Sequence, residues 1–109
     1  MSQVWRESKT IVIDVGTTLA TTDQIEMESF AGGSIHVPSA GGVTELTAYG
    51  QLNGQAWGIA HDEHDDPVVF PVTAGVPKAL PRALWHFPTI KLVATAGAAT
   101  ANVAIFLKS

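Results

Sequence analysis

The sequence predicts an all-β protein, an antiparallel β-sandwich of jelly-roll-like type with seven to eight short strands. Apolar and polar residues alternate in several short runs, and turn residues separate these runs roughly every eight to twelve positions. No apolar stripe with helical spacing lasts beyond one turn. With 109 residues and no cysteine, the chain suits one domain that packing and backbone hydrogen bonds hold together without disulfides.

The strands are predicted from their apolar content and from the turn residues that end them. The apolar run at 10–15 suits a strand buried on both faces. Asn53-Gly54 is typical of a type I′ turn and therefore joins two strands of a hairpin. Pro71 lacks a backbone donor, so its strand lies at a sheet edge or contains a bulge. The predicted strands cover residues 10–15, 24–30, 34–37, 43–50, 55–60, 68–73, 90–95 and 103–108.

The uncharged segment 92–107 suits either a membrane helix or two strands. It is shorter than the ~20 apolar residues that a spanning helix needs. Its apolar residues alternate with others, which predicts the two strands of a hairpin that meet near Gly97. The one predicted helical turn covers 81–85, because Pro81 suits the first position of a helix. We therefore expect no membrane partner.

The first nine residues do not follow the strand pattern. Their charged and aromatic residues show no period, which predicts an N-terminal arm at 1–9 followed by a single sandwich domain at 10–109. An extended arm can add a strand to the sheet edge of a neighbouring molecule. We therefore predict contacts with a second subunit or another partner at Val4, Trp5 and Arg6.

The charge of the chain is small and unevenly distributed. Ten acidic and six basic residues give a formal net charge of −4. Nucleic-acid binding requires a basic surface that neutralises phosphates, so we predict no nucleic-acid partner. Four of the ten acids lie in residues 61–66, which leaves six acids and six bases elsewhere and makes the rest of the chain formally neutral.

Residues 61–66, His-Asp-Glu-His-Asp-Asp, include the residue types of a metal site. Their spacing matches neither the His-Glu-x-x-His helix nor a calcium-binding loop. In an extended loop, neighbouring side chains point to opposite sides, so few of them converge on one ion. We predict a solvated loop with no metal and no cofactor. The weak candidates for metal ligands are His61, Asp62, His64 and Asp66.

The sequence contains no arrangement typical of an enzyme. No Gly-x-Ser-x-Gly nucleophile turn occurs, and neither Gly32-Gly33 nor Gly41-Gly42 has the sequence context of a phosphate-binding loop. The acidic residues are concentrated in one loop instead of being spread around a cleft. We predict a protein without catalytic residues.

The aromatic residues suggest two uses. Trp57 lies beside Ile59 in a predicted strand and is predicted to belong to the core. A carbohydrate-binding module would instead expose aromatic rings as a platform, for which Tyr49 and Trp57 are the candidates. Five of the six prolines fall between residues 67 and 88. Trp85 and Phe87 lie in this proline-rich segment, where they either close one end of the sandwich or contact a second subunit or another partner.

The sequence resembles small β-sandwich virion proteins of tailed bacteriophages in six segments. They occur in the same order, and the acidic loop at 61–66 lies between the third and the fourth. The segments are 30–38, 43–50, 53–57, 80–84, 90–93 and 107–109, and the resemblance covers residues 28–109. Related sequences often have a shorter Asp-rich turn after the Trp-bearing strand. Here that turn is longer and contains His61 and His64.

The resemblance implies a capsid decoration or cement protein, which binds the outer surface of the head and stabilises it by bridging capsomers. It also implies the major capsid protein as partner, trimers at local three-fold positions, and a location on the capsid exterior, with the host cytoplasm during assembly. With this partner, the predicted contacts of Val4, Trp5, Arg6, Trp85 and Phe87 are made to the capsid or to a second subunit. The family has no catalytic residues to transfer. A second function stays open from the residues themselves: a jelly-roll carbohydrate-binding or adhesion module on a virion surface.

Overall fold

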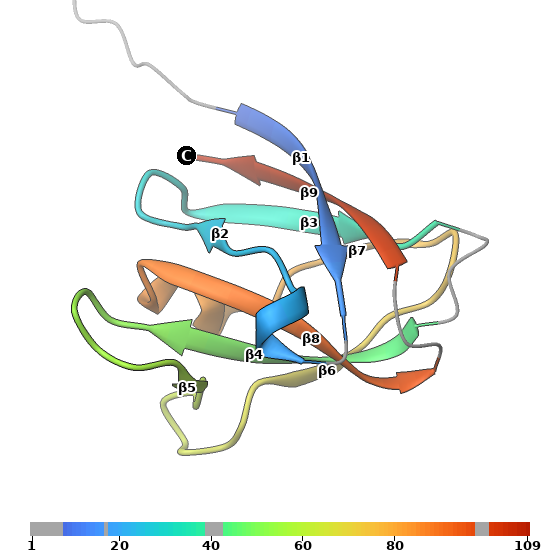
Figure 1. The fold of residues 1–109 in the computed structure, drawn as a ribbon. Helices are drawn as coiled ribbons and strands as arrows, with labels where there is room; N and C mark the ends of the chain where they lie inside the picture. The colour runs from blue at the N-terminus through green and yellow to red at the C-terminus, as the bar shows by residue number, and fades with distance from the viewer. Residues whose placement is uncertain (1–7, 17, 39–42, 98–100) are drawn as a thin grey trace, which may run out of the picture.

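The structure is a computed structural model that describes residues 8–16, 18–38, 43–97 and 101–109. It is nearly all β, with 53% strand, and consists of two antiparallel sheets that pack on each other (Figure 1). This confirms the predicted all-β sandwich. The described residues form nine strands and two 3₁₀ turns, namely β1 (Ser8–Val15), β2 (Ile25–Glu26), β3 (Gly32–His36), β4 (Val43–Gln51), β5 (Gly58–Ile59), β6 (Val69–Pro71), β7 (Pro77–Ala79), β8 (Thr89–Gly97), β9 (Ala101–Lys108), η1 (Leu19–Thr21) and η2 (Arg82–His86).

The strand order is that of a jelly roll. One sheet has the order β1-β9-β3-β7, and the other has the order β2-β8-β4-β5. Strand β6 pairs with the same edge of β4 as β5 does, because the opposite edge of β4 pairs with β8. When β5 and β6 are taken as one interrupted strand, eight strands fill the two sheets as in the double Greek key of jelly rolls.

Alternation along the strands builds one core between the sheets. On β4, Leu46 and Ala48 are fully buried, and on β8 the same holds for Ile90 and Leu92. They pack in one core with Val103, Ile105 and Leu107 of β9, which are also buried. Each large aliphatic side chain removed from water contributes roughly 1.5–3 kcal/mol to folding.

The turn η2 covers one part of the core. Pro81 occupies the N-cap position before the turn, and the Leu84 side chain is fully buried. Trp85 and Phe87 are partly buried and pack against the same core. The structure therefore agrees with the predicted helical turn, displaced by one residue, and with packing of both aromatic rings on the sandwich.

Eight predicted strands are present, but their lengths differ from the prediction. The strand predicted at 24–30 is two residues long, because the Phe30 N–H bonds the Met27 carbonyl in a turn. The strand predicted at 55–60 also has two residues. Strand β7 was not among the predicted strands; it includes Pro77 and lies within the proline-rich part of the chain. The predicted edge position of the strand with Pro71 is confirmed.

Three finer predictions are wrong. Strands β8 and β9 do not form a hairpin, since they belong to different sheets. Strand β1 is not buried on both faces, because Thr10, Val12 and Asp14 are exposed. Of the two turn residues at 53 and 54, only Gly54 has a positive φ, 80°, so the turn is not of type I′. The Gln55 N–H still closes this turn on the Leu52 carbonyl.

The boundary of the predicted arm also changes. Strand β1 begins at Ser8, so Ser8 and Lys9 are strand residues and not part of an arm at 1–9. The predicted contact residues Val4, Trp5 and Arg6 lie outside the described residues.

Candidate functional site

The acidic loop is a closed excursion from the edge of one sheet. The Ala48 carbonyl of β4 accepts from the Ala60 N–H, and the Ala48 N–H donates to the Val68 carbonyl. The Val68 N–H then donates to the Ala60 carbonyl at 2.8 Å, which brings the two ends of the loop together. Residues 61–67 therefore project between β5 and β6 from a paired base, where His61 and Pro67 form a further bridge.

Asp62 organises this loop from within. Its Oδ1 accepts hydrogen bonds from the backbone N–H groups of His64 at 2.8 Å and of Asp66 at 3.0 Å. The bond from Asp66 is the largest cause that lowers the pKa of Asp62, while partial desolvation acts in the opposite direction. The His64 N–H and the charges of His64 and His61 add to the lowering. Asp62 is therefore a structural carboxylate that holds the loop closed.

The four weak metal candidates are not brought together around one point. The described residues contain no group of three or more His, Asp or Glu side chains that is placed to hold a metal ion. The Asp62 Oδ1 is already bonded to backbone N–H groups, and His61 Nδ1 lies 3.0 Å from the Ile59 carbonyl. His64 and Glu63 approach only to 3.9 Å and are both highly exposed, so their pairing contributes little.

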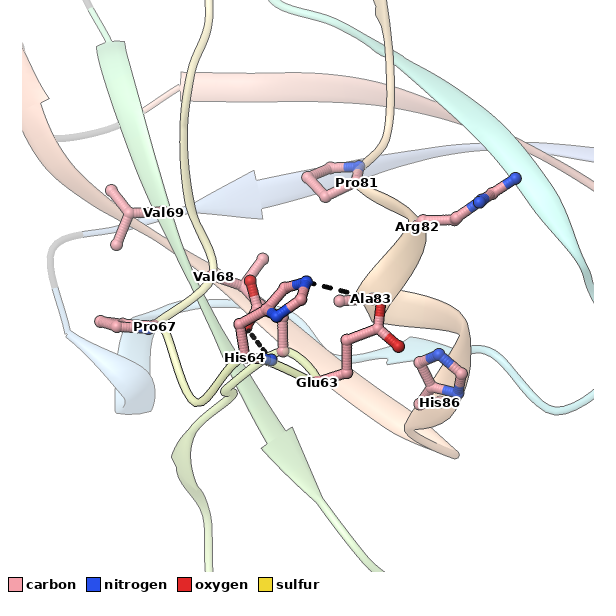
Figure 2. Close-up of a pocket in the computed structure, with 10 residues that line it drawn as sticks. Glu63, His64, Pro67, Val68, Val69, Pro81, Arg82, Ala83 and His86 are labelled. Carbon is pink, nitrogen blue, oxygen red and sulfur yellow. Dashed lines mark hydrogen bonds and ion pairs between the residues drawn. The ribbon is translucent and has the colours of Figure 1, made fainter.

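A pocket of about 330 Å³ lies between the acidic loop and η2. Figure 2 shows Glu63 and His64 on one side and His86 of η2 on the other, while the Arg82 side chain extends away from the loop. Val68, Val69 and two prolines contribute apolar surface. This volume is at the lower end for small-molecule sites. Its lining residues are Asp62, Glu63, His64, Pro67, Val68, Val69, Pro81, Arg82, Ala83 and His86.

The two candidate platform aromatics lie on the outer face of the β2-β8-β4-β5 sheet. Tyr49 is half-buried and faces Lys91 of β8 and Ile59 of β5 across the sheet. Trp57 lies just before β5 and two residues before Ile59, so alternation places both side chains on the same side of the sheet. The Lys91 Nζ lies 5.1 Å from the Trp57 ring centroid. Trp57 is half-buried and does not belong to the core, so its predicted core position is wrong. Lys91 connects the two aromatics on one surface.

The outer face of the β1-β9-β3-β7 sheet carries small, uncharged side chains around two exposed apolar residues. Val12 of β1 is 69% exposed and Phe106 of β9 is 39% exposed. Among the described residues of this face, formal charges occur only at Asp14 and Lys108, near opposite ends of the sheet. The side chains between these ends are those of Thr10, Val12, Ser34, His36, Pro77, Ala79, Ala104 and Phe106.

This uncharged face was not predicted as a site. The sequence of a single strand shows only that inward and outward residues alternate. The uncharged face becomes visible when the pairing of β1 and β3 with β9 places Thr10 and Ser34 on either side of Phe106. His36 is exposed on β3 and belongs to this outer face. Sequence alternation could identify the outward residues, but the neighbours across the sheet come from distant parts of the chain.

Comparisons with known proteins do not assign the chain to a family. No protein-family model matches it, and no significant match occurs among curated proteins or solved structures. Within the described part of the chain, no helix is long and apolar enough to cross a membrane. The class of protein that the structure itself defines is a jelly-roll β-sandwich with an uncharged sheet face, an aromatic face and an acidic loop.

Proposed function

We propose that the protein is a bacteriophage capsid decoration or cement protein, which binds the outer surface of the head and stabilises it by bridging capsomers. The observation that carries this proposal is the uncharged outer face of the β1-β9-β3-β7 sheet. Jelly rolls occur in viral capsid proteins and in lectins, so the fold is compatible with this role but does not decide it. The resemblance of residues 28–109 to phage virion proteins adds to the sheet-face argument.

A flat face of small side chains suits close contact with a protein shell. A buried contact that leaves a charge unpaired is costly, and the described centre of this face has no formal charge to leave unpaired. Val12 and Phe106 supply apolar surface of the kind that anchors interface cores. Several such contacts around a capsomer act together through a high effective concentration.

The proposed partner is the major capsid protein, with trimers at local three-fold positions of the head. The location is the capsid exterior, and the host cytoplasm during assembly. Trp85 and Phe87 remain predicted contact residues, although both pack partly on their own core. Val12 and Phe106 join them as contact candidates that expose more apolar surface.

Binding to capsids tests the proposal. Heads of the phage that carries this sequence, prepared without the protein, are mixed with the wild type, with Phe106→Asp or with Val69→Asp. Val69 is 43% exposed on the other sheet and provides the matched control. We expect saturable binding of the wild type and the control, and at least tenfold weaker binding of Phe106→Asp. Absence of wild-type binding to the heads would refute the proposal.

A second function, a carbohydrate-binding or adhesion module, is favoured by one specific observation. Tyr49 and Trp57 lie on one outer sheet face. Lys91 faces Tyr49 across the sheet, and its Nζ lies 5.1 Å from the Trp57 ring centroid and donates to the Leu19 carbonyl. Aromatic rings with a nearby polar group are suited to sugar rings. A glycan array separates the two functions: saturable binding that Trp57→Ala or Tyr49→Ala abolishes, with the fold intact, would support this second function.

A further inference from the structure

We infer that the open edge of β1 pairs with the β1 edge of a second copy of this chain in an antiparallel, two-fold arrangement. Strand β1 is the terminal strand of its sheet, with β9 on one side and no described strand on the other. Its register with β9 is continuous over all eight residues, so the strand is regular up to its edge. This inference concerns the protein in solution and does not depend on the proposed function, whose trimers belong to the capsid-bound protein.

The hydrogen bonds of Asp14 show which backbone groups point to the open side. The Asp14 N–H donates to Asp23 Oδ2 at 2.9 Å, and its carbonyl accepts from the Asp23 N–H at 3.1 Å. Both groups therefore point away from β9. Because both backbone groups of a residue in an antiparallel strand point to the same side and the direction alternates, those of Ser8, Thr10 and Val12 also face the open edge.

The other sheet edges in the described part of the chain are short or interrupted. Strand β7 has three residues and includes Pro77, which has no N–H. Strand β2 has two residues, and the acidic loop at 61–67 separates β5 from β6. Asp23 bonds the β1 edge at Asp14, and among the described residues no group pairs with the outer edge of residues 8–12. Natural sheets usually block long open edges, so this five-residue stretch, longer than the other described edges, favours a partner strand.

An antiparallel register centred on Thr10 pairs the edge with itself. When Thr10 faces Thr10 of the copy, Ser8 faces Val12, and all three outward residues of each copy lie opposite outward residues of the other. Lys9 then faces Ile11 of the copy, so no like charges are opposed. The same register extends the uncharged outer face across the two-fold axis, with Thr10 of each copy next to its own Phe106.

The contact involves about five edge residues on each side, whereas stable interfaces use roughly 20–30 residues a side. A weak, reversible dimer is therefore expected, and an isologous contact of this kind closes at two copies. An extended peptide of another protein would use the same backbone groups, but it would not continue the uncharged outer face of this sheet across a two-fold axis, as a second copy does.

Sedimentation velocity over a wide concentration range tests the inference with a matched pair at one position. Thr10→Pro removes an N–H that points away from β9, so it blocks the open edge and leaves the β1–β9 hydrogen bonds in place. Thr10→Val retains the N–H. We expect a monomer–dimer equilibrium for the wild type and for Thr10→Val, and dimerisation at least tenfold weaker for Thr10→Pro.

Val12→Lys is a second variant in case Thr10→Pro does not fold. Val12 is 69% exposed, and in the dimer it faces Ser8 of the copy, whose neighbour on β9 is Lys108. The new positive charge should also weaken the dimer at least tenfold. A wild type that stays monomeric at every concentration, or a dimer that both variants leave intact, would overturn the inference. A stable trimer would also overturn it while agreeing with the proposed capsid role.

Discussion

The aromatic ring of Phe87 occupies the space next to Gly50 that a larger residue would need. A Cβ atom on Gly50 would lie 2.7 Å from Phe87 Cδ1 and 3.0 Å from Cγ. Gly50 is buried on β4, and Phe87 follows η2, so this contact joins the second turn to the centre of a sheet. The glycine is needed for the close approach of the ring.

Gly50→Ala should therefore destabilise the protein by displacing the Phe87 ring. We expect a loss of about 1–3 kcal/mol in the free energy of unfolding, which urea denaturation measures. Phe87→Ala removes the obstacle, so adding Gly50→Ala to it should cost much less than Gly50→Ala costs in the wild type. Equal costs in both backgrounds would show that the ring is not the reason for the glycine.

Two adjacent glycines in β3 should respond differently to the same substitution. A Cβ on Gly33 would overlap the backbone oxygen of Phe106, whereas a Cβ on Gly32 would come no closer than 3.8 Å to the Lys108 side chain. Gly33→Ala must push apart β3 and β9, and we expect it to cost about 1–3 kcal/mol. Gly32→Ala is the matched control and should leave the midpoint of thermal unfolding nearly unchanged.

The strands could be predicted from the sequence because alternation and turn residues act locally. Even the edge position of Pro71 follows from its missing N–H. The pairing of β8 could not be predicted in this way. Its alternation is equally compatible with a hairpin to β9 and with the observed position between β2 and β4, and only packing of the whole core distinguishes the two.

The candidate sites were predictable only in part. The segment 61–66 could be recognised as an exposed acidic loop from its composition, but its pocket against η2 depends on residues that are some twenty positions away along the chain. Trp57 was placed in the core because strand alternation does not say which face is inward. In the structure the ring is half-buried outside the core, with the Lys91 Nζ 5.1 Å from its centroid.

The outward position of Trp57 predicts a small effect of its removal on stability. Trp57→Ala loses a partly exposed ring and a cation–π contact with Lys91, and should reduce the free energy of unfolding by less than about 1 kcal/mol. Leu92→Ala, which empties a fully buried site, should cost about 2–5 kcal/mol. Urea denaturation compares the two, and a cost for Trp57→Ala as large as that for Leu92→Ala would place the ring in the core.

The acidic loop should open when Asp62 is protonated. Hydrogen bonds from Asp66 and His64 hold the pKa of Asp62 below its ordinary value of 3.8, so the folded loop prefers the ionised carboxylate. Its contribution is complete above the unfolded value and is lost as pH falls through the lower folded value. The amide proton shifts of residues 64 and 66, followed by NMR, should therefore change with a midpoint below 3.8.

Two substitutions distinguish this mechanism from a general acid effect on the loop. Asp62→Ala should abolish the transition at both amides and speed their hydrogen exchange, because no carboxylate remains to accept the bonds. Asp65→Asn is the control: Asn tolerates the left-handed backbone at this position, where φ is 62°, and the Asp62 bonds remain. The transition should then persist. If both variants lost it, or if the wild-type midpoint lay above 3.8, Asp62 would not be the group that holds the loop closed.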